Sequence, residues 1–311
     1  MMYLLLNTYA GGGSAKKKWE QIESAVQKNI NEVKIINLDS SVDISKVVQE
    51  AEKNDDKDFI IAGGDGTVNF FINNLIDLTN SHEIKKFRIG AIGIGSSNDF
   101  HKPVHNENLI NGIPSKIDFN SCEPRDVCMI KYKTGSEFFH KYFLLNASMG
   151  VTAEANKLFN NPGVVLKFLK KHFTGLAILY AVLRTIFSYR NFGAKIIFDT
   201  YETYSFKISN LSIIKNPNIS GNLSYPCEVN YQNGLYDIYL THSMNKLDLI
   251  NLLKALGKRV FPKNEKTKYC KTSKLKVTSK NNFLIEYDGE IISTNYAEFS
   301  ILTKYLNICT R

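Results

Sequence analysis

The chain has 311 residues, 43% of them hydrophobic, which is enough to build one large domain or two ordinary ones. Its 39 lysines and arginines against 30 aspartates and glutamates give a formal charge of +9, which favours an anionic partner. Five widely spaced cysteines without a C-x-x-C pair are typical of reduced thiols in a cytosolic protein, and they argue against a disulfide framework or a zinc site.

The N-terminal sequence MMYLLLNTYAGGG lacks the basic region of a signal peptide, and we expect its apolar run to be a buried first strand. The longest apolar run, 175–183, is far shorter than the ~20 residues that span a bilayer. Any membrane contact should therefore be peripheral.

Up to about residue 116, apolar β-forming runs alternate with helical patterns. The runs at 3–7, 33–38 and 59–62 each precede a helical pattern, and the run at 89–94 precedes a polar loop. This alternation predicts a parallel sheet with helices on its faces.

After residue 116 the pattern changes to aromatic and β-branched runs separated by short turns, which predicts an antiparallel β-sandwich or barrel. Two helical patterns, at about 163–190 and 245–260, interrupt these strands.

Three of the early strands run directly into loops that contain glycine: NTYAGGGSA (7–15), AGGDGT (62–67) and GIGSSNDF (93–100). In a parallel sheet these loops lie at the carboxyl edge, where open α/β sheets bind ligands. Glycines let backbone N–H groups converge on an anion, and helix N-termini add positive partial charge. The first loop, GGGSAKKK, lacks the G-x-x-x-x-G-K-[ST] spacing of a P-loop. The third loop is not a G-x-G-x-x-G dinucleotide motif, because Asn98 stands in place of the third glycine.

Asp65 is the informative residue of the second loop. A carboxylate that faces phosphates would repel them unless Mg²⁺ lies between, or unless it orients a catalytic or loop group. The alternative is a bare glycine turn in which Asp65 and Thr67 cap the following helix. The other two loops at the same edge favour the functional interpretation.

Taken together, these motifs resemble the diacylglycerol kinase catalytic domain family, which includes bacterial lipid kinases and sphingosine and ceramide kinases. The family's G-G-D-G-T-x-N is complete here, and its N-P-x-[SA]-G and P-x-G-T-x-N-D-[FL] motifs recur with substitutions. The matching segments are 7–11, 63–69, 93–100, 146–155, 233–240 and 288–290, in an order that covers essentially the whole chain.

The resemblance implies an α/β protein of two domains with the active site in the cleft between them. An N-terminal Rossmann-like α/β domain, residues 1–116 with the returning segment 300–311, would bind ATP. A C-terminal antiparallel β-sandwich, residues 117–299, would bind the lipid. The implied reaction is Mg²⁺-dependent transfer of the ATP γ-phosphate to the hydroxyl of a diacylglycerol or sphingoid-type lipid.

The same resemblance implies roles for single residues. Asp65 would place Mg²⁺ near the phosphates, and either Asp288 or Glu290 would be the general base that activates the lipid hydroxyl. Taken alone, the YDGEI segment is more simply an ordinary hairpin turn. The residues expected to hold the nucleotide are Asn7, Ala10, Gly11, Gly12, Gly13, Ser40, Gly63, Gly64, Asp65, Gly66, Thr67, Asn69, Gly95, Ser96, Asn98 and Asp99.

The chain departs from the family pattern at several positions. Thr8 and Gly93 replace prolines, while Ser96 keeps the hydroxyl of the usual threonine. Gln232 and Asn233 stand where several bacterial relatives carry acidic residues for a structural Mg²⁺, which argues against that second metal site here. The metal near the phosphates would not depend on it.

Two segments bear on membrane contact. The apolar and basic stretch 163–187 predicts a helix packed on the sheet with solvated lysines, and a rim that touches the bilayer is the alternative. The stretch 254–276 has nine basic residues against one acid, Glu265, and each can contribute ~1 kcal/mol near an anionic leaflet. We hypothesise that this second stretch docks a cytoplasmic, peripherally bound enzyme on anionic membrane.

Two other functions remain open. A NAD kinase also carries GGDGT and a β-rich second domain, but it phosphorylates a soluble dinucleotide. The chain could instead be an inactive module that binds nucleotide or membrane. Nucleic-acid binding is disfavoured, because no DNA-reading or RNA-stacking motif is present, and a homodimer is left open.

Overall fold

The structure is a computed structural model that describes residues 1–30, 32–39, 41–199, 203–220 and 223–311. The chain divides into two compact units, Met1–Val127 with Thr303–Arg311, and Cys128–Leu302. Within the described ranges, no helix is both long and apolar enough to cross a membrane.

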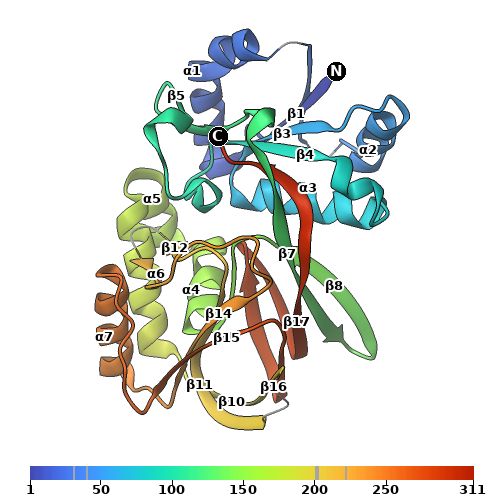
Figure 1. The fold of residues 1–311 in the computed structure, drawn as a ribbon. Helices are drawn as coiled ribbons and strands as arrows, with labels where there is room; N and C mark the ends of the chain where they lie inside the picture. The colour runs from blue at the N-terminus through green and yellow to red at the C-terminus, as the bar shows by residue number, and fades with distance from the viewer. Residues whose placement is uncertain (31, 40, 200–202, 221–222) are drawn as a thin grey trace. The chain divides into compact units, whose positions relative to one another are not determined.

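The first unit is built on a parallel sheet with the strand order β2-β1-β3-β4 (Figure 1). The C-terminal end of β17 adds to this sheet in parallel beside β4, and β6 adds antiparallel to β4. The α/β fold expected from the sequence is therefore confirmed. The strands are β1 (Met2–Leu6), β2 (Val33–Asn37), β3 (Asp58–Gly63), β4 (Arg88–Gly93), β5 (Leu109–Ile110) and β6 (Ile113–Lys116), with β17 given below.

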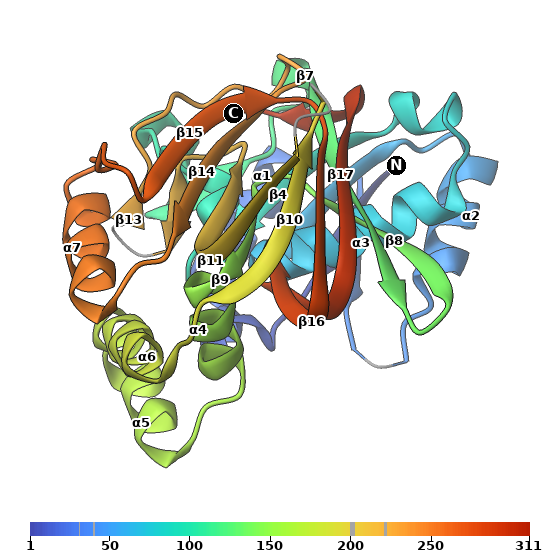
Figure 2. The same ribbon diagram turned by 90° about the horizontal axis from the view of Figure 1, so that it is seen from below.

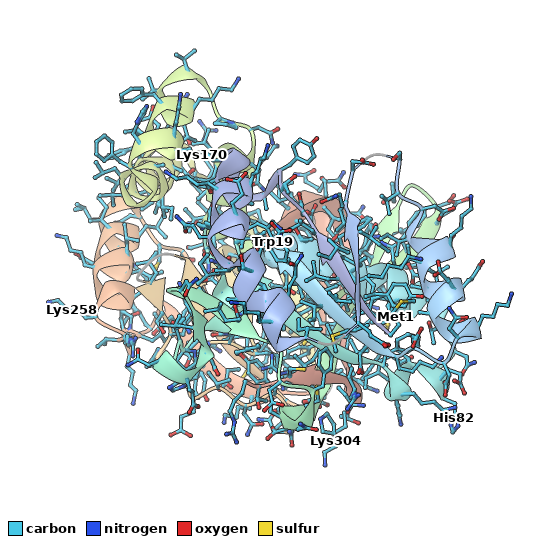
Figure 3. The ribbon with its side chains drawn as sticks, turned by 90° about the horizontal axis from the view of Figure 1, so that it is seen from above. Met1, Trp19, His82, Lys170, Lys258 and Lys304 are labelled. Atoms are coloured by element: carbon cyan, nitrogen blue, oxygen red, sulfur yellow. The ribbon has the colours of Figure 1, made fainter. Side chains whose placement is uncertain are left out.

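Helices cover both faces of this sheet because successive strand residues point to opposite sides. Leu4 and Leu6 face α1, where Trp19 lies in the same buried cluster (Figure 3). Tyr3 faces the other way, stacks on Phe59 and donates a hydrogen bond to Glu50 of α2. The helices are α1 (Ser14–Asn29), α2 (Ile44–Lys53) and α3 (Asp65–Leu78), with short 3₁₀ helices at Ala10–Gly13, Glu83–Lys86, Asp99–His101, Asn106–Asn108 and Phe119–Ser121.

The second unit is built on antiparallel strands in the order β15-β14-β11-β10-β16-β17, with β9 paired to β11 and β16. Side chains that alternate along these strands, such as Leu211, Ile238 and Ile285, form its buried core. The strands are β8 (Glu137–Phe143), β9 (Asn146–Gly150), β10 (Phe192–Phe198), β11 (Thr203–Ile214), β12 (Asn218–Ser220), β13 (Leu223–Ser224), β14 (Tyr236–His242), β15 (Thr267–Thr272) and β16 (Leu275–Tyr287). Two further strands, β7 (Cys122–Thr134) and β17 (Glu290–Cys309), run from one unit into the other.

Among the described residues, the second unit has four helices, and both predicted helical stretches are among them. Helices α5, α6 and α7 lie side by side along one edge of this unit (Figure 1, Figure 2). A capping box between Asn245 and Asp248 begins α7, as its sequence favours. The helices are α4 (Val151–Asn160), α5 (Val164–His172), α6 (Thr174–Ser188) and α7 (Lys246–Gly257).

Candidate active site

The three glycine loops of the first unit are joined to one another by hydrogen bonds. Asn7 donates its side-chain amide to Thr67 Oγ1 at 2.9 Å, which links the first loop to the second. The backbone amides of Ile94 and Gly95 both donate to the carbonyl of Gly63 at 3.0 Å, which links the third loop to the second. The parallel sheet thus brings together the loops that the sequence predicted at its carboxyl edge.

The second and third loops approach so closely that a side chain does not fit between them. A Cβ added to Gly95 would lie 2.4 Å from the Cα of Gly64, a separation that real Cβ atoms do not adopt. Glycine is therefore required at this contact by packing, whether or not a ligand is bound.

The first loop has an unusual backbone. Gly11, Gly12 and Gly13 have φ values of 62°, 66° and 92°, the left-handed region that L-residues rarely adopt. Ser14 then begins α1 and donates its hydroxyl to the carbonyl of Gly11 at 2.9 Å. Gly12 and Gly13 are exposed, so their backbone is accessible at the N-terminus of α1, where an anion is favoured.

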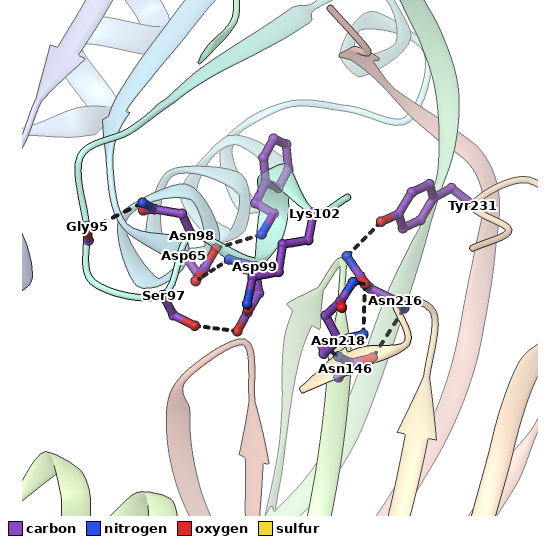
Figure 4. Close-up of polar contacts among 11 residues, drawn as sticks. Asp65, Gly95, Ser97, Asn98, Asp99, Lys102, Asn146, Asn216, Asn218 and Tyr231 are labelled. Carbon is purple, nitrogen blue, oxygen red and sulfur yellow. Dashed lines mark hydrogen bonds and ion pairs between the residues drawn. The ribbon is translucent and has the colours of Figure 1, made fainter. Parts of the chain in front are cut away.

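Asp65 connects the second loop to the third. Its two carboxylate oxygens accept hydrogen bonds from the backbone amides of Asp99 at 3.0 Å and Phe100 at 2.8 Å (Figure 4). Helix α3 has Gly64 at its N-cap and no side-chain cap. Asp65 therefore orients the third loop, and the alternative in which Asp65 and Thr67 cap α3 stays a prediction.

The third loop is held by its own polar side chains. Asn98 has a φ of 52° and donates its amide to the carbonyl of Gly93 at 2.8 Å. Asp99 accepts from Ser97 Oγ at 2.7 Å and pairs with the Lys102 ammonium at 2.7 Å (Figure 4). Both residues were expected to hold nucleotide, and in the structure their side chains build the loop.

The remaining predicted residues differ in accessibility. Asn69 is buried in α3 and accepts from the Asn73 amide at 3.0 Å, whereas Ser96 is exposed. Ser40 lies outside the described residues. Gly12, Gly13 and Ser96 are exposed; Asn7, Ala10, Gly11, Gly64, Asp65, Gly66, Asn98 and Asp99 are half-buried; and Gly63, Thr67, Asn69 and Gly95 are buried.

Lys18 was not predicted as a site residue, yet it reaches the loops. It lies one helical turn after the start of α1, and its ammonium donates to the carbonyl of Gly95 at 2.5 Å. Partial burial lowers the pKa of this amine. A lysine one turn into the helix that follows a glycine loop is the sequence signal that would have found it.

The acidic groups of the first unit suit a metal that arrives with the nucleotide. In the part of the chain that the structure describes, no three Asp, Glu, His or Cys side chains gather as a metal centre. Magnesium in kinase sites needs only one or two protein carboxylates, because substrate phosphates and water supply the other ligands. Asp65, held rigidly between two loops, fits that role.

The late acidic motif forms a tight turn between β16 and β17. Asp288 and Gly289 have φ values of 43° and 94°, and Tyr287 pairs with Glu290, as in a two-residue type I′ hairpin. The predicted alternative of an ordinary hairpin turn describes this backbone correctly.

The two carboxylates of the motif have different surroundings. Asp288 is only 7% exposed and accepts from the backbone amides of Leu144 at 2.7 Å, Leu145 at 3.0 Å and Asn146 at 3.1 Å. The Glu290 side chain is exposed, and none of the described residues forms a hydrogen bond or ion pair with it. Asp288 therefore fixes the turn, and the Glu290 carboxylate is exposed to solvent.

Asn233 lies where the sequence argued against a second metal, and in the structure it binds the ammonium of Lys215 instead. Lys215 is 3% exposed, and its ammonium donates to Asn233 Oδ1 at 2.9 Å and to the carbonyl of Leu235 at 3.0 Å. Nearby, Asn146, Asn216 and Tyr231 form an uncharged network (Figure 4). Amide oxygens that already accept from an ammonium do not fit a divalent metal.

Comparison with known proteins matches the first unit to a known family model. Residues 1–130 match the family model described as the diacylglycerol kinase catalytic domain. The family resemblance is confirmed over this range. The matched residues include all three glycine loops, Lys18 and Asp65, and the late turn at 288–290 lies beyond them.

Similar structures and sequences cover the whole chain. A crystal structure of a diacylglycerol kinase from Bacillus anthracis has a TM-score of 0.69 at 18% identity and covers 100% of this chain and 96% of that one. A second structure from the same organism has a TM-score of 0.73 at 19% identity, with 100% and 97% covered. An uncharacterized protein of Synechocystis sp. is 27% identical over 327 residues, covering 98% of this chain and 69% of the relative. At these identities the structural likeness establishes the fold.

Proposed function

We propose that the chain is an ATP-dependent lipid kinase, which transfers the γ-phosphate of ATP to the hydroxyl of a diacylglycerol or sphingoid-type lipid. The observation that supports this most is the joining of three glycine loops at the carboxyl edge of the sheet, within a matched kinase catalytic domain. Phosphoryl transfer depends mainly on positioning and charge stabilisation, which rigid loops of this kind provide.

In this proposal the nucleotide phosphates lie against the exposed backbone of Gly12 and Gly13, with Ser96 opposite. Lys18 adds positive charge from α1 and fixes the third loop through Gly95. Magnesium, when bound with ATP, would neutralise the charge that develops on the phosphates, and Asp65 would be its protein ligand. The same carboxylate keeps the third loop in place through its two backbone hydrogen bonds.

We further propose that Glu290 is the general base. A base must have a carboxylate oxygen available to accept the proton of the attacking hydroxyl. The Glu290 carboxylate is exposed, whereas that of Asp288 already accepts three backbone hydrogen bonds. Asp288 would then act as a positioning residue that holds the turn before Glu290.

A substrate panel tests the proposed function. Purified protein with ATP and Mg²⁺ is offered diacylglycerol, sphingosine, ceramide and NAD, and the products are identified by mass spectrometry. We expect a phosphorylated lipid and unchanged NAD. Phosphorylation of NAD alone would instead assign the chain a soluble dinucleotide as substrate, and an absence of ATP turnover with every acceptor would identify an inactive module.

A further inference from the structure

Helices α5 and α6 carry large apolar side chains on their outer surface. Val164 is 86% exposed and Phe168 is 60% exposed, although monomeric soluble proteins rarely gather such residues in one place. We call the set the α5–α6 surface; its apolar members are Val164, Val165, Phe168, Phe173, Leu176, Leu179 and Phe187.

These side chains are not the packing face of the two helices. The inner face of the two helices, turned toward the rest of the second unit, is formed by Leu166, Ala177 and Ala181. These residues are buried together, and Leu158 and Leu169 pack against them. The prediction that this stretch is a helix packed on the sheet explains the burial of the inner face, but not the exposure of the outer apolar side chains. The outer apolar side chains lie outside this buried cluster, and their printed contacts are with side chains near the surface, such as Phe168 with His172 and Phe187 with the Lys246 ammonium.

The positive charge of the segment that contains α5 and α6 favours an anionic binding partner. From residue 155 to residue 198 the sequence contains no aspartate or glutamate. A second copy would present the same positive charge and be repelled, whereas an anionic surface would be attracted. The basic residues in this stretch are Lys157, Lys167, Lys170, Lys171, Arg184, Arg190 and Lys195.

The other basic stretch, 254–276, is less suited to docking because the fold neutralises part of it. Lys266 pairs with Asp248 at 2.8 Å, Lys271 with Asp237 at 3.8 Å and Lys276 with Glu298 at 3.4 Å. Exposed apolar side chains are also fewer there, with Val260 at the start of the stretch and Tyr269 in β15.

We propose that the α5–α6 surface docks the protein on an anionic lipid bilayer. The apolar side chains enter the interfacial region, and Lys167, Lys171 and Arg184 contact headgroup phosphates, as in amphipathic helices that lie in a membrane surface. Lys170 is excluded from this set, because its ammonium donates to the carbonyl of Phe159 at 3.0 Å within the fold. The inference deepens the proposed function by naming the surface through which a lipid kinase would reach its substrate.

Vesicle binding of the full chain tests this surface. Binding is measured by co-sedimentation with phosphatidylcholine vesicles, with and without phosphatidylserine, for wild type, Lys167→Gln/Lys171→Gln and Phe168→Ser/Leu176→Ser. We expect binding that requires phosphatidylserine and falls at high salt. Loss of two charges should weaken it by about 30-fold, and the two serine substitutions should weaken it at least as much, because they remove apolar area from the interface.

The matched control is Lys258→Gln/Lys263→Gln, which removes two charges from the other basic stretch and should leave binding within about 3-fold of wild type. All four substituted positions of the test variants are at the surface, and unchanged circular dichroism spectra and Tm confirm their folds. Wild-type binding by both test variants would overturn the proposal. So would loss of binding in the control variant alone, or a test variant that changes the sedimentation coefficient without changing vesicle binding.

The proposed function can fail separately from this inference. Phosphorylation of lipid dispersed in detergent does not need docking, so the test variants should retain it at the wild-type rate. If no acceptor is phosphorylated but vesicle binding still depends on the α5–α6 surface, the kinase proposal falls and the docking surface stands. If lipid is phosphorylated in detergent and vesicles are not bound, the docking surface falls.

Discussion

Asp65 organises a loop in the structure, and we propose that it also places the metal, which the sequence presented as an alternative role. Its carboxylate organises the third loop through the amides of Asp99 and Phe100, and the proposed metal contact would use the same oxygens. A carboxylate at the start of α3 is also favoured by the positive partial charge of the helix N-terminus. In this proposal, positioning of the loop and placement of the metal would depend on the same residue.

Two replacements of Asp65 test how much the residue contributes to stability and how much to kinase activity. Asp65→Asn keeps one acceptor for the two amides, so we expect a loss of about 1–3 kcal/mol in the free energy of unfolding together with loss of kinase activity. Asp65→Ala should lose activity in a protein that still folds. Urea unfolding and ATP turnover measure both effects, and undiminished turnover in purified Asp65→Ala would contradict the assignment.

The two carboxylates of the late turn should behave oppositely. Glu290→Gln removes an exposed carboxylate without a partner among the described residues, so stability should stay within about 0.5 kcal/mol while turnover is lost. Asp288→Asn disturbs three backbone hydrogen bonds and should cost roughly 2–3 kcal/mol. Thermal unfolding and turnover of the two variants are compared; a stable, active Glu290→Gln would exclude it as the base.

Buried Lys116 predicts a pH effect on stability. Burial and the nearby Arg125 guanidinium lower its pKa from 10.5 to about 8 in the folded protein. Between these values the unfolded chain binds more protons, so stability should rise with pH by up to roughly 3 kcal/mol. Below about pH 8 the amine is charged in both states and the cost of burying it is fully present.

The measurement is urea unfolding of wild type and Lys116→Met at both ends of this window. The variant should lack the part of the rise that belongs to Lys116, because it has no amine to deprotonate. Equal pH dependence in the two proteins would show that this group does not titrate as its burial implies.

The contact between the second and third loops makes a sharp prediction about glycine. Gly95→Ala would place a Cβ against the backbone of Gly64, which cannot move away as a flexible side chain could. We expect the loops to separate and ATP affinity to fall at least about 10-fold, equivalent to about 1.4 kcal/mol.

Gly175→Ala is the control, since nothing lies within 4 Å of its added Cβ and it sits in helix α6. This variant should be neutral or slightly more stable, because alanine favours helix. Isothermal titration with ATP distinguishes the two; equal ATP affinity for Gly95→Ala and wild type would show that the tight contact is not needed for binding.

Local patterns in the sequence were sufficient to predict the strands β1, β3 and β4 and the glycine loops after them. Apolar runs, helical spacing and glycine positions are properties of neighbouring residues, and they determine which edge of a parallel sheet each loop occupies. The same reasoning placed both helical stretches of the second unit correctly.

The contacts that define the site depend on residues far apart in the chain, and no local pattern encodes them. The bonds from Asp99 and Phe100 to Asp65, from Lys18 to Gly95, and from Lys215 to Asn233 are of this kind. Helical periodicity also cannot tell whether an apolar side chain such as Phe168 will find a neighbour. Its exposure emerges only when the helices are placed on the fold.

The two units of the molecule carry different candidate functional features. The first unit matches a kinase catalytic domain and contains the glycine loops, while the second contains the late turn and the α5–α6 surface. The predicted assignment of ATP to the first domain and lipid to the second stays a prediction.

The most direct test of this account is an assay of lipid phosphorylation by wild type and Glu290→Gln. The assay contains ATP and Mg²⁺, and the lipid acceptors are dispersed in detergent. We predict that wild type converts one class of hydroxyl lipid to its phosphate, and that Glu290→Gln binds ATP with wild-type affinity but forms no product. Wild-type protein that phosphorylates no lipid, or a Glu290→Gln variant with full turnover, would contradict the account.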